Sequence, residues 1–199
     1  MNIIIFGPPG AGKGTQSKIL VEKLNSFQVS TGDMLRDEIK KDTEIGKKIL
    51  NNMDDGKFVD DEIVNKLLEK ILFDSKKNKL IFDGYPRTIN QAKNLEILLK
   101  KSNQKIDYIF FLNVKKDSII ERIEKRKTLE KRSDDDANVI LKRYDTYMEI
   151  TKPVLDYYSK NQNFHEVDGS MEINEIAQKI EEIISEWEID IESTSYIKG

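Results

Sequence analysis

Short, largely apolar runs alternate along this chain with longer segments in which apolar residues recur every three or four positions. The runs lie at residues 3–6, 27–29, 80–82, 108–114 and 164–167. Each run has the length and composition of a buried β-strand, and the segments between them are long enough for helices. This alternation predicts an α/β protein with a doubly wound sheet of five parallel strands. In such sheets ligands bind beyond the carboxyl ends of the strands.

Two segments are too long and too polar to be simple crossovers between strands. Residues 30–59 are rich in charge, with Gly56 as a turn signal, and residues 126–137 are almost without apolar side chains. Both segments are typical of lobes that stand over a site. The length of 199 residues, without Gly/Ser-rich or Pro-rich linkers, favours one domain over residues 1–199. Its core would comprise residues 1–29, 60–125 and 138–199, and residues 188–199 are expected to form a frayed tail.

The segment after the first predicted strand is rich in glycine and contains a lysine. It reads Gly7-Pro8-Pro9-Gly10-Ala11-Gly12-Lys13-Gly14-Thr15 and leads into a predicted amphipathic helix. In such a loop the backbone N–H groups point at one anion, while the helix N-terminus and the lysine add positive charge. The segment therefore predicts a P-loop that binds the phosphates of ATP or GTP. Gly14 stands where Ser or Thr is usual, and the hydroxyl comes one residue later, at Thr15.

Polar motifs also follow the other predicted strands. Ser30-Thr31-Gly32-Asp33 follows the second strand, Asp83-Gly84-Tyr85-Pro86-Arg87 the third and Asp168-Gly169 the fifth. Six arginines lie in or beside the predicted site: Arg36, Arg87, Arg122, Arg126, Arg132 and Arg143. Several permanently charged guanidinium groups in one place suit a polyphosphate ligand. Arg87 is the most informative of them, because the glycine and proline before it predict a tight turn that holds its side chain toward the ligand.

Composition and charge exclude several classes of function. Charged residues make up 35% of the chain but leave a net charge of -3, so we expect no nucleic-acid partner. The chain has no cysteine, which excludes disulfides, thiolate nucleophiles and cysteine-based zinc sites. Its single histidine is His165, which we interpret as a structural or surface residue without a catalytic role. With no signal peptide and no long apolar stretch, we expect a cytoplasmic protein without a membrane partner.

The motifs resemble those of the adenylate kinases, a family of nucleoside monophosphate kinases, over almost the whole chain. The resemblance rests on Gly-Pro-Pro-Gly-Ala-Gly-Lys-Gly-Thr-Gln at 7–16, Ser-Thr-Gly-Asp-Met-Leu-Arg at 30–36, Gly-Lys-Phe-Val at 56–59, Phe-Asp-Gly-Tyr-Pro-Arg-Thr at 82–88 with Gln91, Arg-x-x-x-Arg at 122–126, and Arg-Ser-Asp-Asp at 132–135 with Arg143. The Gly14-Thr15 pair is the family's own form of the loop. The resemblance implies a P-loop sheet with a monophosphate-binding lobe at 30–59 and a short lid at 126–137, without zinc.

The resemblance implies a binding site for the phosphate donor, ATP. The ATP phosphates would lie on Gly10, Ala11, Gly12, Lys13, Gly14 and Thr15, with Lys13 reaching toward the transferred phosphoryl group. Arg122 would lie against the adenine of ATP, Arg126 would hold ATP from the lid, and the backbone near Met171 would meet the base. Asp83 would orient Mg²⁺, the implied cofactor, through water molecules.

The resemblance also implies a site for the acceptor, AMP. That site would consist of Thr31, Arg36, Lys57, Phe58, Val59, Gly84, Tyr85, Pro86, Arg87 and Gln91. Arg132 and Arg143 would close over the phosphates. The catalytic groups would be Lys13, Arg87, Arg126, Arg132 and Arg143, because phosphoryl transfer needs positioning and positive charge and no side-chain nucleophile.

The implied reaction is reversible phosphoryl transfer from ATP to AMP, which gives two ADP, by a monomeric enzyme. Thr31, Thr88 and Gln91 go with adenine in the family, whereas UMP/CMP kinases tend to carry Ala and Asn at the two threonine positions. One alternative is therefore a UMP/CMP kinase with relaxed base choice. Another is a regulatory P-loop NTPase, which would not need an acceptor site around Arg36 and Arg87.

Overall fold

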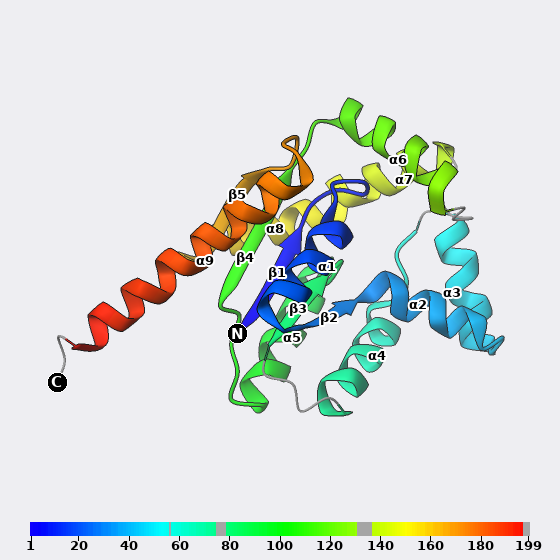
Figure 1. The fold of residues 1–199 in the computed structure, drawn as a ribbon. Coiled ribbons are helices and arrows are strands. Elements are labelled where there is room, and N and C mark those ends of the chain that lie inside the picture. Colours follow the sequence, from blue (N-terminus) through cyan, green and yellow to red (C-terminus); the bar gives the residue numbers. More distant parts are fainter. Residues whose placement is uncertain (56, 75–78, 131–136, 197–199) are drawn as a thin grey trace.

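A parallel sheet with strand order β2-β3-β1-β4-β5 forms the centre of the molecule (Figure 1). The computed structural model describes residues 1–55, 57–74, 79–130 and 137–196, without the side chains of 74, 126–130, 137, 138 and 187–196. The strands are β1 (Asn2–Phe6), β2 (Phe27–Ser30), β3 (Leu80–Asp83), β4 (Tyr108–Asn113) and β5 (Phe164–Asp168). Each strand lies where the apolar pattern predicts it, to within one residue. For the described residues the α/β class and the five-stranded parallel sheet are therefore confirmed.

Helices fill the connections between the strands. They are α1 (Lys13–Leu24), α2 (Thr31–Lys40), α3 (Glu44–Asp54), α4 (Asp61–Asp74), α5 (Ile89–Lys101), α6 (Lys116–Glu130), α7 (Ala137–Thr146), the π-helical turn η1 (Tyr147–Thr151), α8 (Lys152–Tyr158) and α9 (Ile173–Tyr196). The side chains of Ser30, Thr43 and Thr88 each accept a hydrogen bond from the backbone N–H three residues further on. These caps start α2 and α5 at the carboxyl edge of the sheet and α3 in the segment that follows α2.

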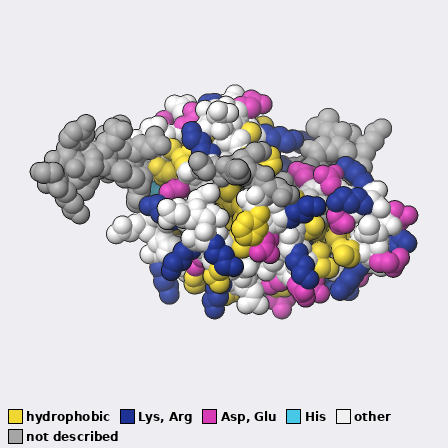
Figure 2. Space-filling model, turned by 90° about the horizontal axis from the view of Figure 1, so that it is seen from below, with side chains coloured by type: hydrophobic (Ala, Val, Ile, Leu, Met, Phe, Trp, Pro, Cys, Tyr) yellow, Lys and Arg dark blue, Asp and Glu magenta, His cyan; other side chains and the backbone are white. Residues whose placement is uncertain are grey.

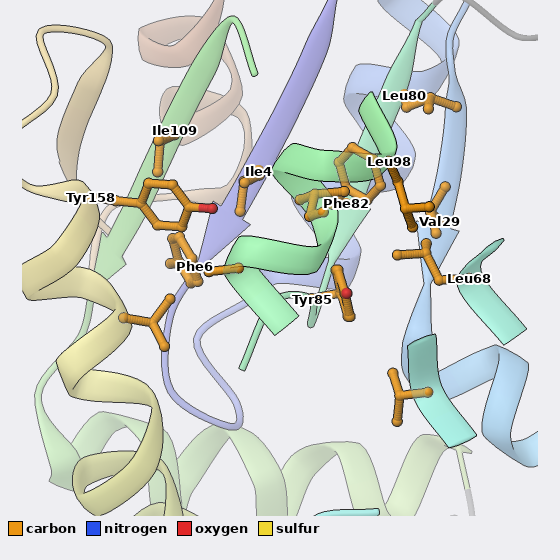
Figure 3. Packing of buried hydrophobic residues seen from close by; sticks show 14 of the residues in the cluster. Ile4, Phe6, Val29, Leu68, Leu80, Phe82, Tyr85, Leu98, Ile109 and Tyr158 are labelled. Carbon is orange, nitrogen blue, oxygen red and sulfur yellow. The ribbon is translucent and has the colours of Figure 1, made fainter. Parts of the chain in front are cut away.

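Alternate residues of β1 enter hydrophobic clusters on opposite faces of the sheet. Ile3 and Ile5 pack with buried residues of α1, α6 and α9. Ile4 and Phe6 pack with residues of α4, α5 and α8 (Figure 3). Because both faces of the central strand are covered, its side chains are almost fully buried. The loop that follows β1 is therefore held at the centre of the sheet.

The chain passes from α7 to α8 through the π-helical turn η1. The backbone N–H of Lys152 donates to the carbonyl of Tyr147, five residues back, as in a π-helix. Pro153 follows directly, and its ring and missing N–H disturb a regular helix at this point. The π-turn absorbs the disturbance without ending the helical path.

The carboxyl-terminal segment differs from the frayed tail expected over residues 188–199. Helix α9 continues to Tyr196 and extends past the end of the sheet (Figure 1). Its first part is anchored by buried Ile176, Ile180 and Ile184. No glycine or proline occurs between residues 173 and 196, so nothing in the sequence stops the helix once it has begun. Residues 197–199 lie outside the described ones.

Charges of both signs cover the surface. In the view of Figure 2, Lys and Arg side chains are interspersed with Asp and Glu side chains, with apolar patches between them. This pattern agrees with the small net charge of -3. Among the helices that the structure describes, none is long and apolar enough to cross a membrane.

Candidate active site

The loop between β1 and α1 is a tight turn stabilised by its own backbone. The N–H of Ala11 donates to the carbonyl of Pro8 at 3.1 Å. The Lys13 ammonium donates to the carbonyls of Gly7 and Pro8, at 2.8 and 3.0 Å. Gly12 caps α1 with φ +94°, a conformation that L side chains rarely adopt. The positive end of α1 and the lysine thus lie together at the carboxyl edge of the sheet.

A pocket lies directly over this loop. Its lining includes eleven of the residues predicted from the sequence, namely Gly10, Gly12, Lys13, Gly14, Thr15, Arg36, Asp83, Gly84, Arg87, Arg122 and Arg143. These residues come from five different parts of the chain, from the P-loop to α7. The pocket is strongly polar and collects positive charge, as a site for a polyphosphate requires.

A second pocket adjoins the first. It is lined by Thr31, Arg36, Lys57, Phe58, Val59, Gly84, Arg87, Gln91 and Arg143, together with apolar side chains of α2, α3 and α4. Arg36, Gly84, Arg87 and Arg143 line both pockets. The two hollows therefore share a wall of arginines, with apolar surface on one side and the P-loop on the other.

Arg87 is held in this shared wall by contacts from several elements. Its Nε donates to the carbonyl of Gly84 at 2.7 Å, and its backbone N–H donates to Gln91 Oε1 at 2.8 Å. Its own carbonyl accepts a hydrogen bond from Thr151 Oγ1 of η1 at 3.1 Å. The guanidinium lies 5.4 Å from the centre of the Phe58 ring, within range of a cation–π interaction. These contacts fix the direction of the charged group.

Gly84 is the close-packed point of the β3–α5 turn. It has φ +75°, and a Cβ there would lie 2.9 Å from Arg87 Nη2 and 3.0 Å from Thr31 Oγ1. The hydroxyl of Thr31 donates to the Gly84 carbonyl at 2.8 Å. A side chain at this position would displace the arginine or the threonine, so the turn requires glycine.

Arg122 joins the P-loop to the turn between β5 and α9. Its Nη2 donates to the Gly169 carbonyl at 2.7 Å, and its Nη1 donates to the Ala11 carbonyl at 3.4 Å. Nearby, hydrogen bonds from Ser170 lower the pKa of Asp168 and hold the turn in place. Met171 follows on the same turn and is half-buried.

Asp83 lies at the end of β3, against the P-loop. Its Oδ2 accepts a hydrogen bond from Gln28 Nε2 at 3.1 Å. A Cβ at position 14 would lie 3.3 Å from the same oxygen, so the carboxylate faces the loop where Gly14 leaves room for it. This placement puts one negative group among the cations of the pocket.

Comparisons with known proteins agree with this arrangement. A family model described as adenylate kinase matches residues 5–163. The chain belongs to the adenylate kinase family. It is 49% identical to an adenylate kinase of Pelagibacter ubique (strain HTCC1062), over 92% of this chain and 99% of that protein. The adenylate kinases of Caulobacter sp. (strain K31) and Archaeoglobus fulgidus are 42% and 37% identical, over 93% and 92% of this chain and 98% of each relative.

Adenylate kinases are phosphotransferases, and this chain is accordingly a phosphotransferase. Its alignment with the Pelagibacter protein spans 211 positions, more than the 199 residues of this chain. That relative therefore contains residues that this chain lacks.

Some residues that the resemblance assigns to the adenylate kinase site lie apart from the pockets or outside the described residues. Tyr85 is buried, and its hydroxyl lies within hydrogen-bond distance of two acceptors, Asn65 Oδ1 at 2.8 Å and the Gln91 carbonyl at 3.0 Å, so its single proton serves one of them at a time. Burial raises the pKa of the Tyr85 phenol to about 12, so the group stays neutral.

The other assigned residues differ in their places. Ala11 is buried, and Pro86 lines an adjoining pocket together with Lys13 and Arg87. Met171 lines none of these three pockets. Arg132 and the side chain of Arg126 lie outside the described residues.

Some site residues of this adenylate kinase family member are not identified by the motifs. Asp61 contacts both Thr88 and Gln91, and Thr151 holds the backbone of Arg87. In the sequence Asp61 is one of three successive acids at a predicted helix start, where acids are common without any role in a site. Thr151 lies far along the chain from Arg87 and carries no motif.

Proposed function

We propose that this chain transfers the γ-phosphoryl group of Mg·ATP reversibly to AMP and so forms two ADP. The observation that carries the proposal is the pair of adjoining pockets with a common arginine wall. A P-loop hydrolase needs space for a nucleotide and a water molecule only. Here the second pocket is lined by residues of α2, α3, α4, α5 and α7 and of the loops between them, and it combines apolar walls with charged groups, as an acceptor nucleotide requires.

On the donor side, the backbone of Gly10 to Thr15 holds the ATP phosphates. Lys13 exchanges its contacts with the loop carbonyls for oxygens of the transferred group. Arg122 lies against the adenine, the backbone near Met171 meets the base, and Arg126 contacts ATP from the lid at 126–137. The contact of Arg122 with the Gly169 carbonyl supports this part of the proposal, because it places the guanidinium beside the turn that carries Met171.

On the acceptor side, AMP lies between the lobe at 30–59 and the β3–α5 turn. Its contacts are Thr31, Arg36, Lys57, Phe58, Val59, Gly84, Tyr85, Pro86, Arg87 and Gln91, with Tyr85 acting through its backbone. Arg132 and Arg143 close over the phosphates. An AMP phosphate oxygen then attacks the γ-phosphorus in line with the departing ADP, and the charge that develops falls beside Arg87 and Arg143.

Asp83 fits the role of holding Mg²⁺ through water. Its carboxylate faces the P-loop, and oxygen ligands combined with retained water suit this ion. When bound with ATP, Mg²⁺ supplies positive charge to the phosphates. Asp83 stays oriented by Gln28, so the chain offers the ion a fixed oxygen.

We further propose that the chain acts as a cytoplasmic monomer. Arg36, Arg87 and Arg143 each line both pockets, so one chain would bring the donor and the acceptor together.

A turnover assay with Mg·ATP and a panel of AMP, CMP, UMP and GMP tests the proposal. We expect ADP to form only when a monophosphate is present, with two ADP for each AMP consumed and with AMP the best acceptor. ADP formation without an acceptor would identify a hydrolase instead. A higher kcat/KM for CMP or UMP than for AMP would identify a UMP/CMP kinase.

A further inference from the structure

We propose that Asp61 is a positioning residue that makes the acceptor pocket selective for a 6-aminopurine by fixing the orientation of the Gln91 amide. The inference rests on the proposed function and concerns the same acceptor pocket. It follows from a small hydrogen-bond network between the start of α4 and the start of α5.

Asp61 is the first residue of α4 and uses each of its carboxylate oxygens. Its Oδ1 accepts from Gln91 Nε2 at 2.7 Å, and its Oδ2 accepts from Thr88 Oγ1 at 2.7 Å. Gln91 is 2% exposed and lines the acceptor pocket. The acid therefore acts on a side chain that faces the ligand without itself lining that pocket.

The directions of these hydrogen bonds leave the amide only one orientation. Gln91 Oε1 accepts from the backbone N–H of Arg87 at 2.8 Å, while Nε2 faces Asp61. In the reversed orientation the amide oxygen would face a carboxylate and the NH₂ group would face an N–H. Two unsatisfied polar groups in a buried position are energetically unfavourable, so the reversed orientation of the Gln91 amide is excluded.

Thr88 is a second donor to the Asp61 carboxylate. Its Oγ1 accepts the backbone N–H of Gln91 at 3.1 Å, so its hydroxyl proton is available for Asp61. A carboxylate accepts and cannot donate, and both neighbours must therefore donate to it. An asparagine at position 61 has an oxygen on one side and an NH₂ group on the other. It would therefore direct a donor at one of the two donors, Gln91 Nε2 or Thr88 Oγ1.

The fixed amide retains a donor and an acceptor for the ligand. Of its two N–H groups and two oxygen lone pairs, one of each is used by Asp61 and Arg87 within the described residues. The pairing edge of adenine offers the N6 amino group as a donor and N1 as an acceptor, which complements this pair. Hypoxanthine offers O6 as an acceptor and N1–H as a donor, and it would need the reversed amide. AMP and IMP therefore differ at the group that Asp61 controls.

The test uses Asp61→Asn and Asp61→Ser in the full chain, with kcat/KM measured for AMP and for IMP at saturating Mg·ATP. We expect the ratio of AMP to IMP to fall tenfold or more in both variants, mainly through a higher KM for AMP. The KM for ATP should stay within about twofold of wild type, because the donor pocket is untouched. Circular dichroism and thermal melting establish that each variant is folded.

The matched control is Glu62→Gln. Glu62 carries the same charge in the same helical turn, but it is exposed and pairs with Lys66 at 2.7 Å. We expect its AMP to IMP ratio to equal that of wild type. An unchanged ratio in folded Asp61 variants, or an equal fall in the control, would overturn the inference. If wild type fails to form ADP from AMP at all, the proposed function itself fails, which is a separate outcome.

Discussion

Arg87 lies in the wall between the two pockets, and its backbone and side chain are each tied to the fold. Gly84 holds it from its own turn, Gln91 from α5 and Thr151 from η1. Lys13, in contrast, contacts carbonyls of its own loop. Positive groups that are fixed before the substrate arrives lower the barrier to phosphoryl transfer without reorganising during the reaction.

We expect Lys13→Ala and Arg87→Ala each to lower kcat by at least about 100-fold, because each removes a charge from the reacting phosphates. The free energy of unfolding should change by less than about 1.5 kcal/mol, since neither side chain belongs to the hydrophobic clusters. Steady-state kinetics and urea denaturation measure the two effects. Lys18→Ala is the control, because Lys18 is an exposed lysine at the edge of the same pocket. Turnover close to wild type in either site variant would refute the assigned role.

Single residues were predictable from the sequence where the chemistry is local. Lys13 stands between glycines after a strand, and Arg87 follows a turn-forming Gly-Tyr-Pro, so spacing alone identifies them. Asp61 could not be found in this way. Its partners lie 27 and 30 positions further along the chain, and only the packing of α4 beside α5 brings them together.

At the scale of elements, η1 shows how a helix irregularity can serve the site. The π-turn places Tyr147 and Thr151 on the wall of the hollow that also contains Lys13 and Arg87. Pro153 indicates from the sequence that the helix is disturbed here, but not that the disturbance takes the form of a wider turn.

The strands were predictable because their runs are short, apolar and separated by turn residues. The length of α9 was not, since mixed acidic and apolar residues suit either a helix or a tail.

We expect Thr151→Val to lower the free energy of unfolding by about 1 to 3 kcal/mol, because it leaves the Arg87 carbonyl without its donor in a buried position. Loss of this contact should also lower kcat, since the turn that carries Arg87 is released from η1. Urea denaturation and steady-state kinetics measure both changes.

Thr146→Val provides the comparison for this substitution. Thr146 is half-buried, and its hydrogen bond to the Lys142 carbonyl within α7 is exposed to solvent, so its replacement should alter stability by less than about 0.5 kcal/mol. If the two variants lose equal amounts of unfolding free energy, the hydrogen bond from Thr151 to the Arg87 carbonyl contributes no more to stability than the one within α7.

At the scale of the whole molecule, one hydrophobic cluster contains three buried tyrosine side chains. Tyr85, Tyr147 and Tyr158 all belong to the cluster that packs α4, α5 and α8 against the sheet. Burial raises the pKa of Tyr85 to about 12 and raises the pKa values of Tyr147 and Tyr158 as well.

The parallel sheet was predictable from the sequence, because apolar runs alternate with helical segments. The strand order and the junction of the two pockets depend on long-range pairings that local patterns do not contain.

These phenols predict a loss of stability in alkali. An unfolded tyrosine ionises near pH 10, whereas folded Tyr85 keeps its proton to about pH 12. Between these values the folded state binds more protons, so stability falls as pH rises, by about 1.4 kcal/mol per pH unit for Tyr85. Tyr85→Phe should be less stable than wild type at pH 8 but should decline less steeply above pH 10. Urea denaturation from pH 8 to 11.5 measures the slopes, and parallel curves for the two proteins would contradict this assignment.

The position of β1 in the sheet has a consequence for the chain as it is synthesised. β1 is synthesised well before its neighbours in the sheet, which are β3, beginning at Leu80, and β4, beginning at Tyr108. Until then the nascent chain carries the apolar strand Asn2–Phe6 without either partner. Such an unpaired strand is prone to aggregate. The newborn polypeptide should therefore remain open to chaperone binding until β3 and β4 have been synthesised.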